Sequence, residues 1–391
     1  MSISQYSYFS IIYQPAPLRM KKLFSTLSLL FTGITLFAQS LAQPYADAGN
    51  QHYDAGRYKE AIAEYSKAVY VEPKYAQAWN NRGLAKLEIN DYTGALADFN
   101  KVITLDPKNA EAYRNRATLK IRQENYAGAL ADYNKAIALS PDDPDMYYNR
   151  GLAYVAQNKK KEALADFNKS ILLKPDVADS YLERAQIKLD MNDNDGALKD
   201  YAEVIKRSPN SYDAYLNRAL VYEKLQKRAE ALADYNQVLI LSPNNLTAYF
   251  NRSLLKIRQT DYQGAIQDLD KVIARSPKMA AAYANRGLAK EKTSKDKEAL
   301  ADYNKAISLK PKDAGNLIER GGLKMKLQDF NGAVTDFTQA IALKPNAADA
   351  FYGRGYSRIQ LKQNATACPD LQKAKQLGSK KADDLLLKNC K

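Results

Sequence analysis

The dipeptide Asn-Arg, followed by a small residue, returns along this chain at intervals of 34 residues or a multiple of 34. It begins at Asn81, Asn115, Asn149, Asn217, Asn251 and Asn285, and three further copies keep the arginine but place Glu183, Glu319 or Gly353 before it. A fixed period of this length indicates one supersecondary unit copied in tandem, with each copy packed on its neighbours. A chain of 391 residues built in this way needs no single large core, so its fold follows from the fold of one copy.

Each copy carries the pattern of two amphipathic helices. With Ala42 as position 1, position 20 is alanine in all ten copies, positions 4 and 24 are aromatic or leucine, position 8 is small, and position 32 is proline in nine copies. Positions 4, 8 and 11, and then 20, 24, 27 and 28, follow helical spacing. The small residues allow the two helices to approach closely, while the proline ends the second helix. Gly, Asn or Asp near positions 15–16 is expected to separate the two helices.

This pattern resembles the tetratricopeptide repeat, and it recurs without insertion across residues 42–381. The resemblance implies an all-α fold, a right-handed α-solenoid in which antiparallel helix pairs stack and the first helices line a concave groove. Ten repeats are expected over residues 43–381, followed by a capping helix over 382–391 that covers the last apolar edge. The repeats are expected to begin near residues 42, 76, 110, 144, 178, 212, 246, 280, 314 and 348.

The N-terminal segment has the features of a secretory signal peptide. Met20-Lys21-Lys22 precedes an apolar stretch to Phe37, and Ser40-Leu41-Ala42 supplies small residues at a cleavage site. We expect residues 20–42 to be the signal peptide and 1–19 to lie upstream of the true start; an uncleaved anchor is the alternative. Either form predicts export, to a bacterial periplasm or the envelope surface; the cleaved form predicts only transient contact with a membrane, through the signal peptide.

The two cysteines, Cys368 and Cys390, lie on either side of Gly378 near the C-terminus. In two antiparallel helices joined near Gly378 they would lie at the same level, so a disulfide is expected, and export would favour it. Two free thiols are the alternative. Pro369 is expected in the first turn of its helix, after Thr366, where a missing N–H costs little.

Composition narrows the classes of function. The formal charge is +14, of which residues 1–42 contribute +3, so the balance permits anionic partners but also fits a mixed solvated surface. One histidine and two cysteines leave no material for most His-dependent catalysis or for a His/Cys metal cluster. We therefore expect no enzyme and no cofactor, and we interpret the acidic segment 190–196 as a turn between helices, since it lacks the spacing of a calcium loop.

Arginine at position 7 lies on a helix stripe where an apolar residue would be expected, and an acid recurs at position 23. A partly buried guanidinium needs a carboxylate, so the two rows predict a structural ladder of ion pairs, within one repeat or between neighbouring repeats. An arginine row that binds phosphate is the alternative. The arginines are Arg82, Arg116, Arg150, Arg184, Arg218, Arg252, Arg286, Arg320 and Arg354, and the acids are Asp98, Asp132, Asp166, Asp200, Asp234, Asp268, Asp302, Asp336 and Asp370, with Glu64 in the first repeat.

Asparagine at position 6 is the better candidate for binding. Asparagine is unfavourable inside a helix, so six copies indicate a role. The resemblance implies a ladder of amides that hydrogen-bonds a peptide backbone, although Glu183, Glu319 and Gly353 interrupt it; amides that satisfy their own helices are the alternative. The candidate groove consists of Asn81, Asn115, Asn149, Asn217, Asn251, Asn285 and the apolar residues Tyr148, Leu152, Leu216, Leu220, Phe250 and Leu254.

These features together predict a non-enzymatic exported scaffold that binds a protein or peptide segment in its groove. An apolar floor with amide rungs suits a peptide better than nucleic acid, which we consider an unlikely ligand. The alternative function is binding of an anionic polymer, nucleic acid or envelope polysaccharide, through the basic surface; its mark would be a steep salt dependence.

Overall fold

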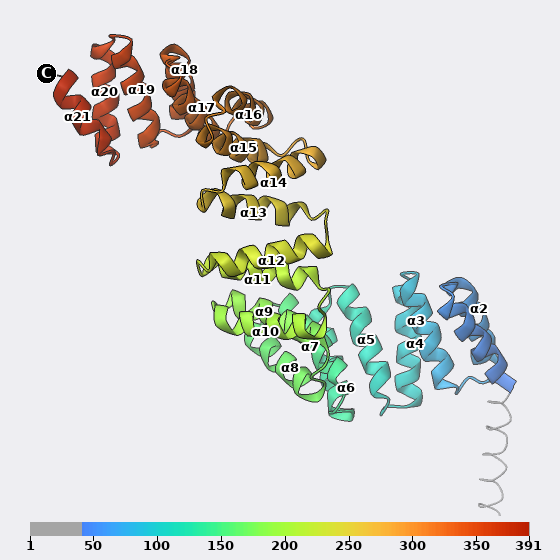
Figure 1. Ribbon diagram of the computed structural model, residues 1–391. Helices are drawn as coiled ribbons and strands as arrows, with labels where there is room; N and C mark the ends of the chain where they lie inside the picture. Colours follow the sequence, from blue (N-terminus) through green and yellow to red (C-terminus); the bar gives the residue numbers. More distant parts are fainter. Residues whose placement is uncertain (1–40, 391) are drawn as a thin grey trace, which may run out of the picture. The chain divides into compact units, whose positions relative to one another are not determined.

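The computed structural model describes residues 41–390, and every regular element in that range is a helix (Figure 1). Within each of the two units described below, consecutive helices are antiparallel neighbours that stack in chain order, so the predicted all-α array of helix-turn-helix repeats is confirmed. No helix in this range is long and apolar enough to cross a membrane. The predicted signal segment lies outside the described residues except for Leu41 and Ala42, and Ala42 is buried in the core of the first repeat.

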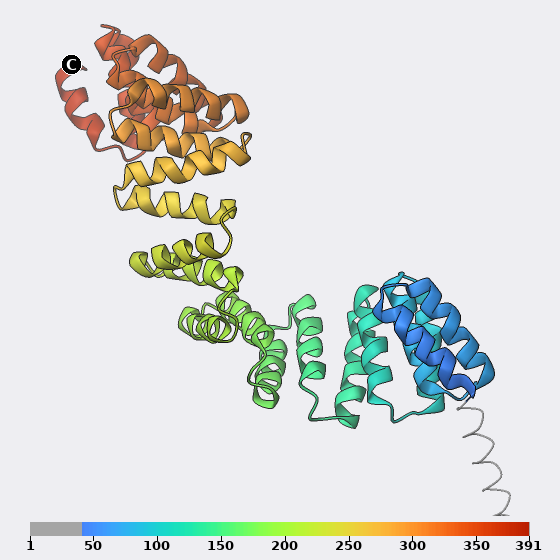
Figure 2. The same cartoon turned by 45° about the vertical axis from the view of Figure 1, so that its right-hand side comes forward.

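The described residues divide into two compact units, 41–190 and 191–390, each a stack of antiparallel helices (Figures 1 and 2). In the N-terminal unit the helices are residues 41–54, α2 Tyr58–Val71, α3 Ala76–Glu88, α4 Tyr92–Leu105, α5 Ala110–Arg122, α6 Tyr126–Leu139, α7 Pro144–Ala156, α8 Lys160–Leu173 and α9 Ala178–Asp190. In the C-terminal unit they are α10 Asn194–Arg207, α11 Tyr212–Lys224, α12 Arg228–Leu241, α13 Leu246–Arg258, α14 Tyr262–Arg275, α15 Ala280–Lys292, α16 Asp296–Leu309, α17 Ala314–Lys326, α18 Phe330–Leu343, α19 Ala348–Gln360, α20 Asn364–Gln376 and α21 Lys381–Asn389. From α3 to α19 the odd-numbered helices are the first helices of their repeats and the even-numbered ones the second.

The turn inside each repeat is made by two residues with different tasks. Position 15 adopts the left-handed conformation in all ten repeats, and nine of these residues are not glycine, for example Asn90 with φ 61° and Lys362 with φ 60°. Position 16 then caps the second helix where it is Asp or Asn: the Asp91 carboxylate accepts from the Gly94 N–H at 2.9 Å. A Cβ at Gly94 would lie 2.2 Å from that carboxylate, which explains why glycine accompanies the acidic cap. Asp193 caps α10 in the same way, so segment 190–196 is a helix-helix turn.

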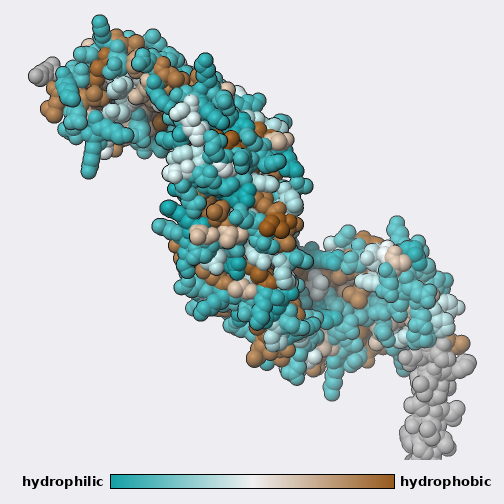
Figure 3. All heavy atoms as spheres, in the orientation of Figure 1, coloured by the Kyte–Doolittle hydropathy of each residue, from teal (hydrophilic) through white to brown (hydrophobic). Residues whose placement is uncertain are grey.

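Where position 24 is aromatic, as in the second repeat, the core contains a ring from the second helix packed on a small residue of the first. Phe99 is fully buried, and a Cβ placed on Gly83 would lie 2.7 Å from its ring. Alanines at position 20, such as Ala95, are also fully buried, so the two backbones approach closely at this level. These contacts give the reason for the small residue at position 8. On the face shown in Figure 3, hydrophilic side chains predominate, with separate apolar patches between them.

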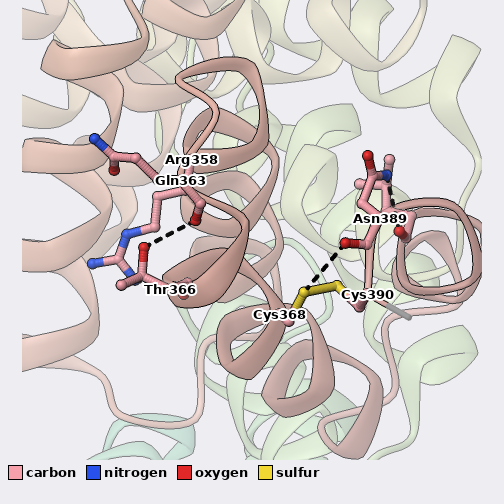
Figure 4. Close-up of a disulfide and its surroundings, with 7 residues drawn as sticks. Arg358, Gln363, Thr366, Cys368, Asn389 and Cys390 are labelled. Atoms are coloured by element: carbon pink, nitrogen blue, oxygen red, sulfur yellow. Dashed lines mark hydrogen bonds between the residues drawn. A yellow bond between two sulfur atoms is a disulfide. The ribbon is translucent and has the colours of Figure 1, made fainter.

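The C-terminal end contains the expected disulfide and one departure from expectation. Cys368 in α20 is bonded to Cys390, which follows α21, with 5.6 Å between the Cα atoms (Figure 4). Ala382 of α21 is buried against Leu371 and Ala374 of α20, so α21 covers the end of the stack. The prediction for Pro369 was wrong: α20 begins at Asn364, so the proline lies inside the helix, beyond its first turn. Nearby, Arg358 donates to the carbonyl of Thr366 at 3.1 Å.

Candidate functional site

The arginine at position 7 pairs with the aspartate at position 23 of its own repeat, which answers the question that the sequence left open. Arg82 donates from Nε and Nη2 to the two carboxylate oxygens of Asp98 at 2.9 and 2.8 Å, a bidentate geometry. Asp98 is 1% exposed, so the carboxylate is desolvated and depends on these donors. The same pairing joins Arg116–Asp132, Arg150–Asp166, Arg218–Asp234, Arg252–Asp268, Arg286–Asp302, Arg320–Asp336 and Arg354–Asp370.

The third guanidinium nitrogen reaches back to the preceding repeat. Nη1 of Arg116 donates to Asn100 at 2.6 Å, and position 25 supplies the acceptor in each such case. The other acceptors are Ser66, Asn134, Asn168, Asn236, Asp270, Asn304 and Thr338, which bond Arg82, Arg150, Arg184, Arg252, Arg286, Arg320 and Arg354. The sequence analysis missed this position, although a small polar residue recurs there with the same 34-residue period.

Two further groups surround each ion pair. A lysine at position 11 adds a second cation to the carboxylate, as in Lys86–Asp98 at 2.8 Å. Where position 11 is tyrosine, the arginine lies over that ring, as with Arg150 and Tyr154 at 5.8 Å. Hydrogen bonding to the aspartate raises the pKa of Arg150 above its usual range. The guanidinium donors of these arginines are therefore already used in hydrogen bonds and ion pairs within the chain, which argues against a row of arginines that binds phosphate.

The asparagines at position 6 are all at least partly buried, and several of their amides are already used within the chain. Asn115 donates to Asn80 at 2.8 Å, while Asn149 and Asn285 donate to carbonyls of their own helices at 2.7 and 2.8 Å. Asn81 donates to Asn50 at 3.0 Å. Hence the row does not present identical free amides. Asn217 and Asn251 lie on the same helix stripe in the C-terminal unit, both partly buried.

The first helices of neighbouring repeats lie side by side within each unit, for example α3 beside α5 and α15 beside α17. Their shared surface consists of positions 2, 5, 6, 9, 12 and 13 of each repeat, and we call it the first-helix face. The predicted apolar residues lie on it unequally. Tyr148 and Leu152 pack against the buried cluster around Phe167, and Leu216 and Phe250 pack against the cores of their repeats. Leu254 is partly buried, whereas Leu220 is 43% exposed.

Two cavities open on the first-helix face of the N-terminal unit. One, of about 330 Å³, is lined by Asn50, Tyr53, Asp54, Tyr65, Asn81 and Leu84. The other, of about 250 Å³, is lined by Arg114, Thr118, Pro144, Asp145, Tyr148, Asn149, Ser170, Val177, Asp179 and Ser180. Each combines a tyrosine, an asparagine from the predicted row and a carboxylate. Such a mixture can accept a side chain and hold it by polar contacts at the same time.

The tyrosine at position 24 contributes a polar group to this face that the sequence analysis did not identify. Its ring fills the core while its hydroxyl bonds a first-helix residue: Tyr65 donates to Asn50 at 2.7 Å, and Tyr235 to Glu223 at 2.5 Å. Burial raises the pKa of Tyr65 to about 12. The alternation of Tyr with Phe or Leu at position 24 was the available signal.

Two glutamates replace the asparagine at position 6 and have unusual environments. Burial, and then the charge of Asp179, raise the pKa of Glu183; burial and the charge of Glu291 raise that of Glu319. The single histidine, His52, accepts a hydrogen bond from Arg57 at 3.0 Å. Within residues 41–390 no group of His, Cys, Asp and Glu is arranged to hold a metal ion.

Comparison with known families agrees with the repeat geometry. The family described as "Tetratricopeptide repeat" matches residues 46–110, 182–245, 250–314 and 319–382, a second family of that description matches 144–177, and one described as "TPR repeat" matches 119–158. No curated protein matches the chain.

Solved structures resemble the chain at low sequence identity. YrrB, described as a TPR protein with an unusual peptide-binding site, is 23% identical with a TM-score of 0.42, and the match covers 47% of this chain and 95% of YrrB. The pilF protein of Pseudomonas aeruginosa is 20% identical with a TM-score of 0.49, covering 54% and 96%. Yeast Tom70 is 16% identical with a TM-score of 0.38, covering 88% and 94%. At these identities the likeness concerns the repeat fold alone.

Proposed function

Because this chain belongs to the tetratricopeptide repeat family, we propose that it is a non-enzymatic scaffold that binds a protein or peptide segment on its first-helix face. Proteins of this family bind protein partners in general, and the ion pairs at positions 7 and 23 leave the first-helix face free of that structural task. The partner is a segment of another protein rather than a small metabolite, since the face extends over several repeats.

One observation carries the proposal: the two cavities described above lie on the predicted face of the N-terminal unit, and each includes an asparagine of the predicted row. Asn81 lines the first and Asn149 the second. Their Nδ2 atoms are held by Asn50 and by the backbone of Asp145, an arrangement that fixes each amide and leaves its oxygen to accept a hydrogen bond. A fixed acceptor beside an aromatic floor favours an extended segment with side chains that enter the cavities.

Export to a bacterial periplasm or envelope surface is part of this proposal. The disulfide between Cys368 and Cys390 supports it, because such bonds persist in oxidising compartments. Mass spectrometry of the protein recovered from the native host would test it by giving the mature N-terminus and the state of both thiols. A chain that retains residues 20–42 and has free thiols would contradict export.

Selection from a random peptide library, followed by affinity measurement, tests the binding function. We expect a selected peptide to lose at least tenfold in affinity when Asn81 and Asn149 are changed to alanine. Asn331→Ala with Asn346→Ala is the matched control, because these exposed amides lie outside the first-helix face. Circular dichroism first checks that each variant is folded. Failure to select any peptide, or equal losses in both variants, would refute the proposed face.

A second candidate function, binding of an anionic polymer, is favoured by the distribution of charge. Residues 41–190 hold 21 basic and 21 acidic residues, whereas 191–391 hold 34 and 23, so the excess lies in the C-terminal unit. Lys310, Lys312 and Lys344 are exposed around a hollow of about 880 Å³. Changing these three lysines to glutamine should weaken binding of heparin and flatten its salt dependence. Retention of heparin independent of salt would argue against this function.

A further inference from the structure

We propose that the first-helix face of the N-terminal unit binds a basic segment, one rich in Lys and Arg, and that its two cavities accept cationic side chains of that segment. This inference rests on the proposed peptide-binding function and names the chemical class of its partner. It is carried by the separation of charge within the unit and by the surroundings of the two cavities.

Charge is segregated within a unit that is neutral as a whole. Residues 41–190 contain 21 basic and 21 acidic residues, yet positions 2, 5, 6, 9, 12 and 13 of its five first helices contain eight carboxylates and two arginines. The face therefore has a formal charge of −6, and the remainder of the unit has +6. A negatively charged face on a unit with no net charge attracts a positively charged ligand without causing non-specific binding over the rest of that unit.

Most of these carboxylates are not neutralised by the chain itself. Of the eight, Glu88, Glu111 and Asp190 form ion pairs. The other five form none within the part of the chain that the structure describes. They are Asp47, Asp54, Asp145, Asp179 and Glu183. Unpaired carboxylates in a row can bind a cationic ligand without first breaking an internal pair.

The second cavity has the features of a subsite for a cationic side chain. Asp145 and Asp179 line it from the first turns of α7 and α9, and Tyr148 forms part of its wall. The Tyr148 ring is held in place by Phe167, with 5.8 Å between the centroids. Burial, and then the charges of Glu183 and Asp179, raise the pKa of Tyr148 to about 12. A cation there would gain both carboxylates and an aromatic face.

Arg114, the one cation in this cavity, does not fill that role. Its guanidinium lies 3.7 Å from Glu111 and 3.7 Å from Asp143, so it is balanced by two acids that do not line the cavity. Among residues 41–390, no cation forms an ion pair with Asp145 or Asp179. A cationic side chain of the ligand could therefore pair with these two carboxylates.

The first cavity repeats the arrangement at the other end of the unit. Asp54 lies beside Tyr53 and Tyr65, with Asn81 as the amide. Asp54 contributes to the raised pKa values of both tyrosines, although burial is the larger cause. Two separated subsites that each combine a tyrosine, an asparagine and at least one aspartate fit two basic side chains on one extended segment better than a single compact ligand.

The C-terminal unit does not share this chemistry, which makes it an internal reference. On its first-helix face the same positions of repeats six to ten hold five acids and four basic residues, and leucine or an aromatic residue occupies many of positions 5 and 9. Glu223 on that face is paired with Arg258 at 2.8 Å. Any preference for a basic segment therefore belongs to the N-terminal unit.

The test uses the full chain and three synthetic peptides of about 12 residues, long enough when extended to span roughly 40 Å. They share one alanine- and serine-based sequence and carry four lysines, four glutamines or four glutamates at the same positions. We expect the lysine peptide to bind at least tenfold more tightly than either of the others in fluorescence anisotropy, and to weaken as sodium chloride rises from about 0.05 to about 0.5 M.

Matched triple variants locate the site. Asp145→Asn with Asp179→Asn and Glu183→Gln should weaken lysine-peptide binding at least tenfold. Asp213→Asn with Asp349→Asn and Glu319→Gln makes the same charge change at positions 2, 2 and 6 of the C-terminal unit, and should change binding less than twofold. Each aspartate lies in the first turn of its helix, so any loss of helix stability is common to both variants.

The outcomes separate this inference from the function on which it rests. If the three peptides bind equally well and the Asn81/Asn149 variant still loses affinity for a selected peptide, the face binds peptides but not by charge, and the inference is overturned. Equal losses in the two triple variants would overturn it as well. If the library yields no peptide at all, it is the proposed binding function that fails.

Discussion

The pairing of one arginine with two aspartates allows a sharp test of what holds neighbouring helices together. Arg286 donates from Nε and Nη2 to Asp302 at 2.9 and 2.6 Å, and from Nη1 to Asp270 at 2.7 Å. The Asp302 side chain is 6% exposed, whereas that of Asp270 is 52% exposed. Changing either aspartate to asparagine is the same chemical change against the same partner, so any difference between the variants reports burial.

The expected magnitudes differ by several fold. Asp302→Asn removes the charge that faces both Arg286 and Lys290, and it turns amide hydrogens toward cations that have little access to water. Removal of one partner from a buried ion pair costs about 3–5 kcal/mol. Asp270→Asn loses an ion pair in contact with solvent and can still accept through its amide oxygen, as asparagine does at this position in other repeats, so it should cost under about 1 kcal/mol.

Urea denaturation followed by far-UV circular dichroism measures both variants against the unchanged chain. Repeat arrays can unfold in stages, so the two variants are compared on the unfolding transition whose midpoint changes in both. The change in free energy of unfolding is calculated from that midpoint only where the slope m is the same as in the unchanged chain. The reasoning is refuted if the two variants are destabilised equally, or if Asp270→Asn is the more harmful. A destabilisation by Asp302→Asn under about 1 kcal/mol would also show that the carboxylate is not desolvated in solution.

Three further predictions concern other parts of the array. Cys368→Ser opens a loop of 22 residues and should cost about 3 kcal/mol, with faster hydrogen exchange in α21 and unchanged exchange in α3. Gly83→Val places a branched side chain where even an added Cβ would lie 2.7 Å from the Phe99 ring, so it should lower stability in thermal melts by about 1–3 kcal/mol. At Gly322 an added Cβ would meet nothing within 4 Å, so Gly322→Ala should be neutral or stabilising. Burial and neighbouring acids raise the pKa of Glu319 in the fold, so its ionisation penalises the native state above the unfolded pKa of about 4.5; Glu319→Gln should therefore stabilise at pH 7 and lose this advantage near pH 4 in urea titrations. Melts of Gly322→Ala as unstable as those of Gly83→Val, or a benefit of Glu319→Gln that grows as pH falls, would contradict these two arguments.

Much of the fold could be predicted because the same helical spacing of apolar residues recurs in every 34-residue repeat. Alanine at position 20 and an aromatic residue or leucine at position 24 define the buried stripe of every second helix, and Ala95 and Phe99 are indeed fully buried. The position of Pro369 within its helix was predicted wrongly because proline is common in the first turn of helices. α20 instead begins at the repeat position where the second helices of the other repeats begin, which is before the proline. Repetition is thus a stronger guide than a single residue preference.

The site could be predicted less well because hydrogen-bond partners depend on three-dimensional placement. Six asparagines at one repeat position suggest six equal rungs, but the side chain at position 5 or 9 of the preceding repeat decides how each amide is used. Asn115 meets the buried Asn80, Asn81 meets Asn50, and Asn149 finds only its own backbone. Likewise, nothing in the spacing of the arginines indicated that Nη1 would bond the preceding repeat.

One arginine lacks that third bond, because position 25 of the repeat before it is Ala202. Arg218 still pairs with Asp234, so the two helices of its own repeat are joined by an ion pair. Among the contacts of the described residues, however, no hydrogen bond runs from Arg218 in α11 back to α10. In a linear array, cooperativity is set by the coupling between neighbours, and the weakest coupling decides where the array divides during unfolding. The joint between the fifth and sixth repeats is thus the point at which we expect the chain to separate into two blocks that melt independently.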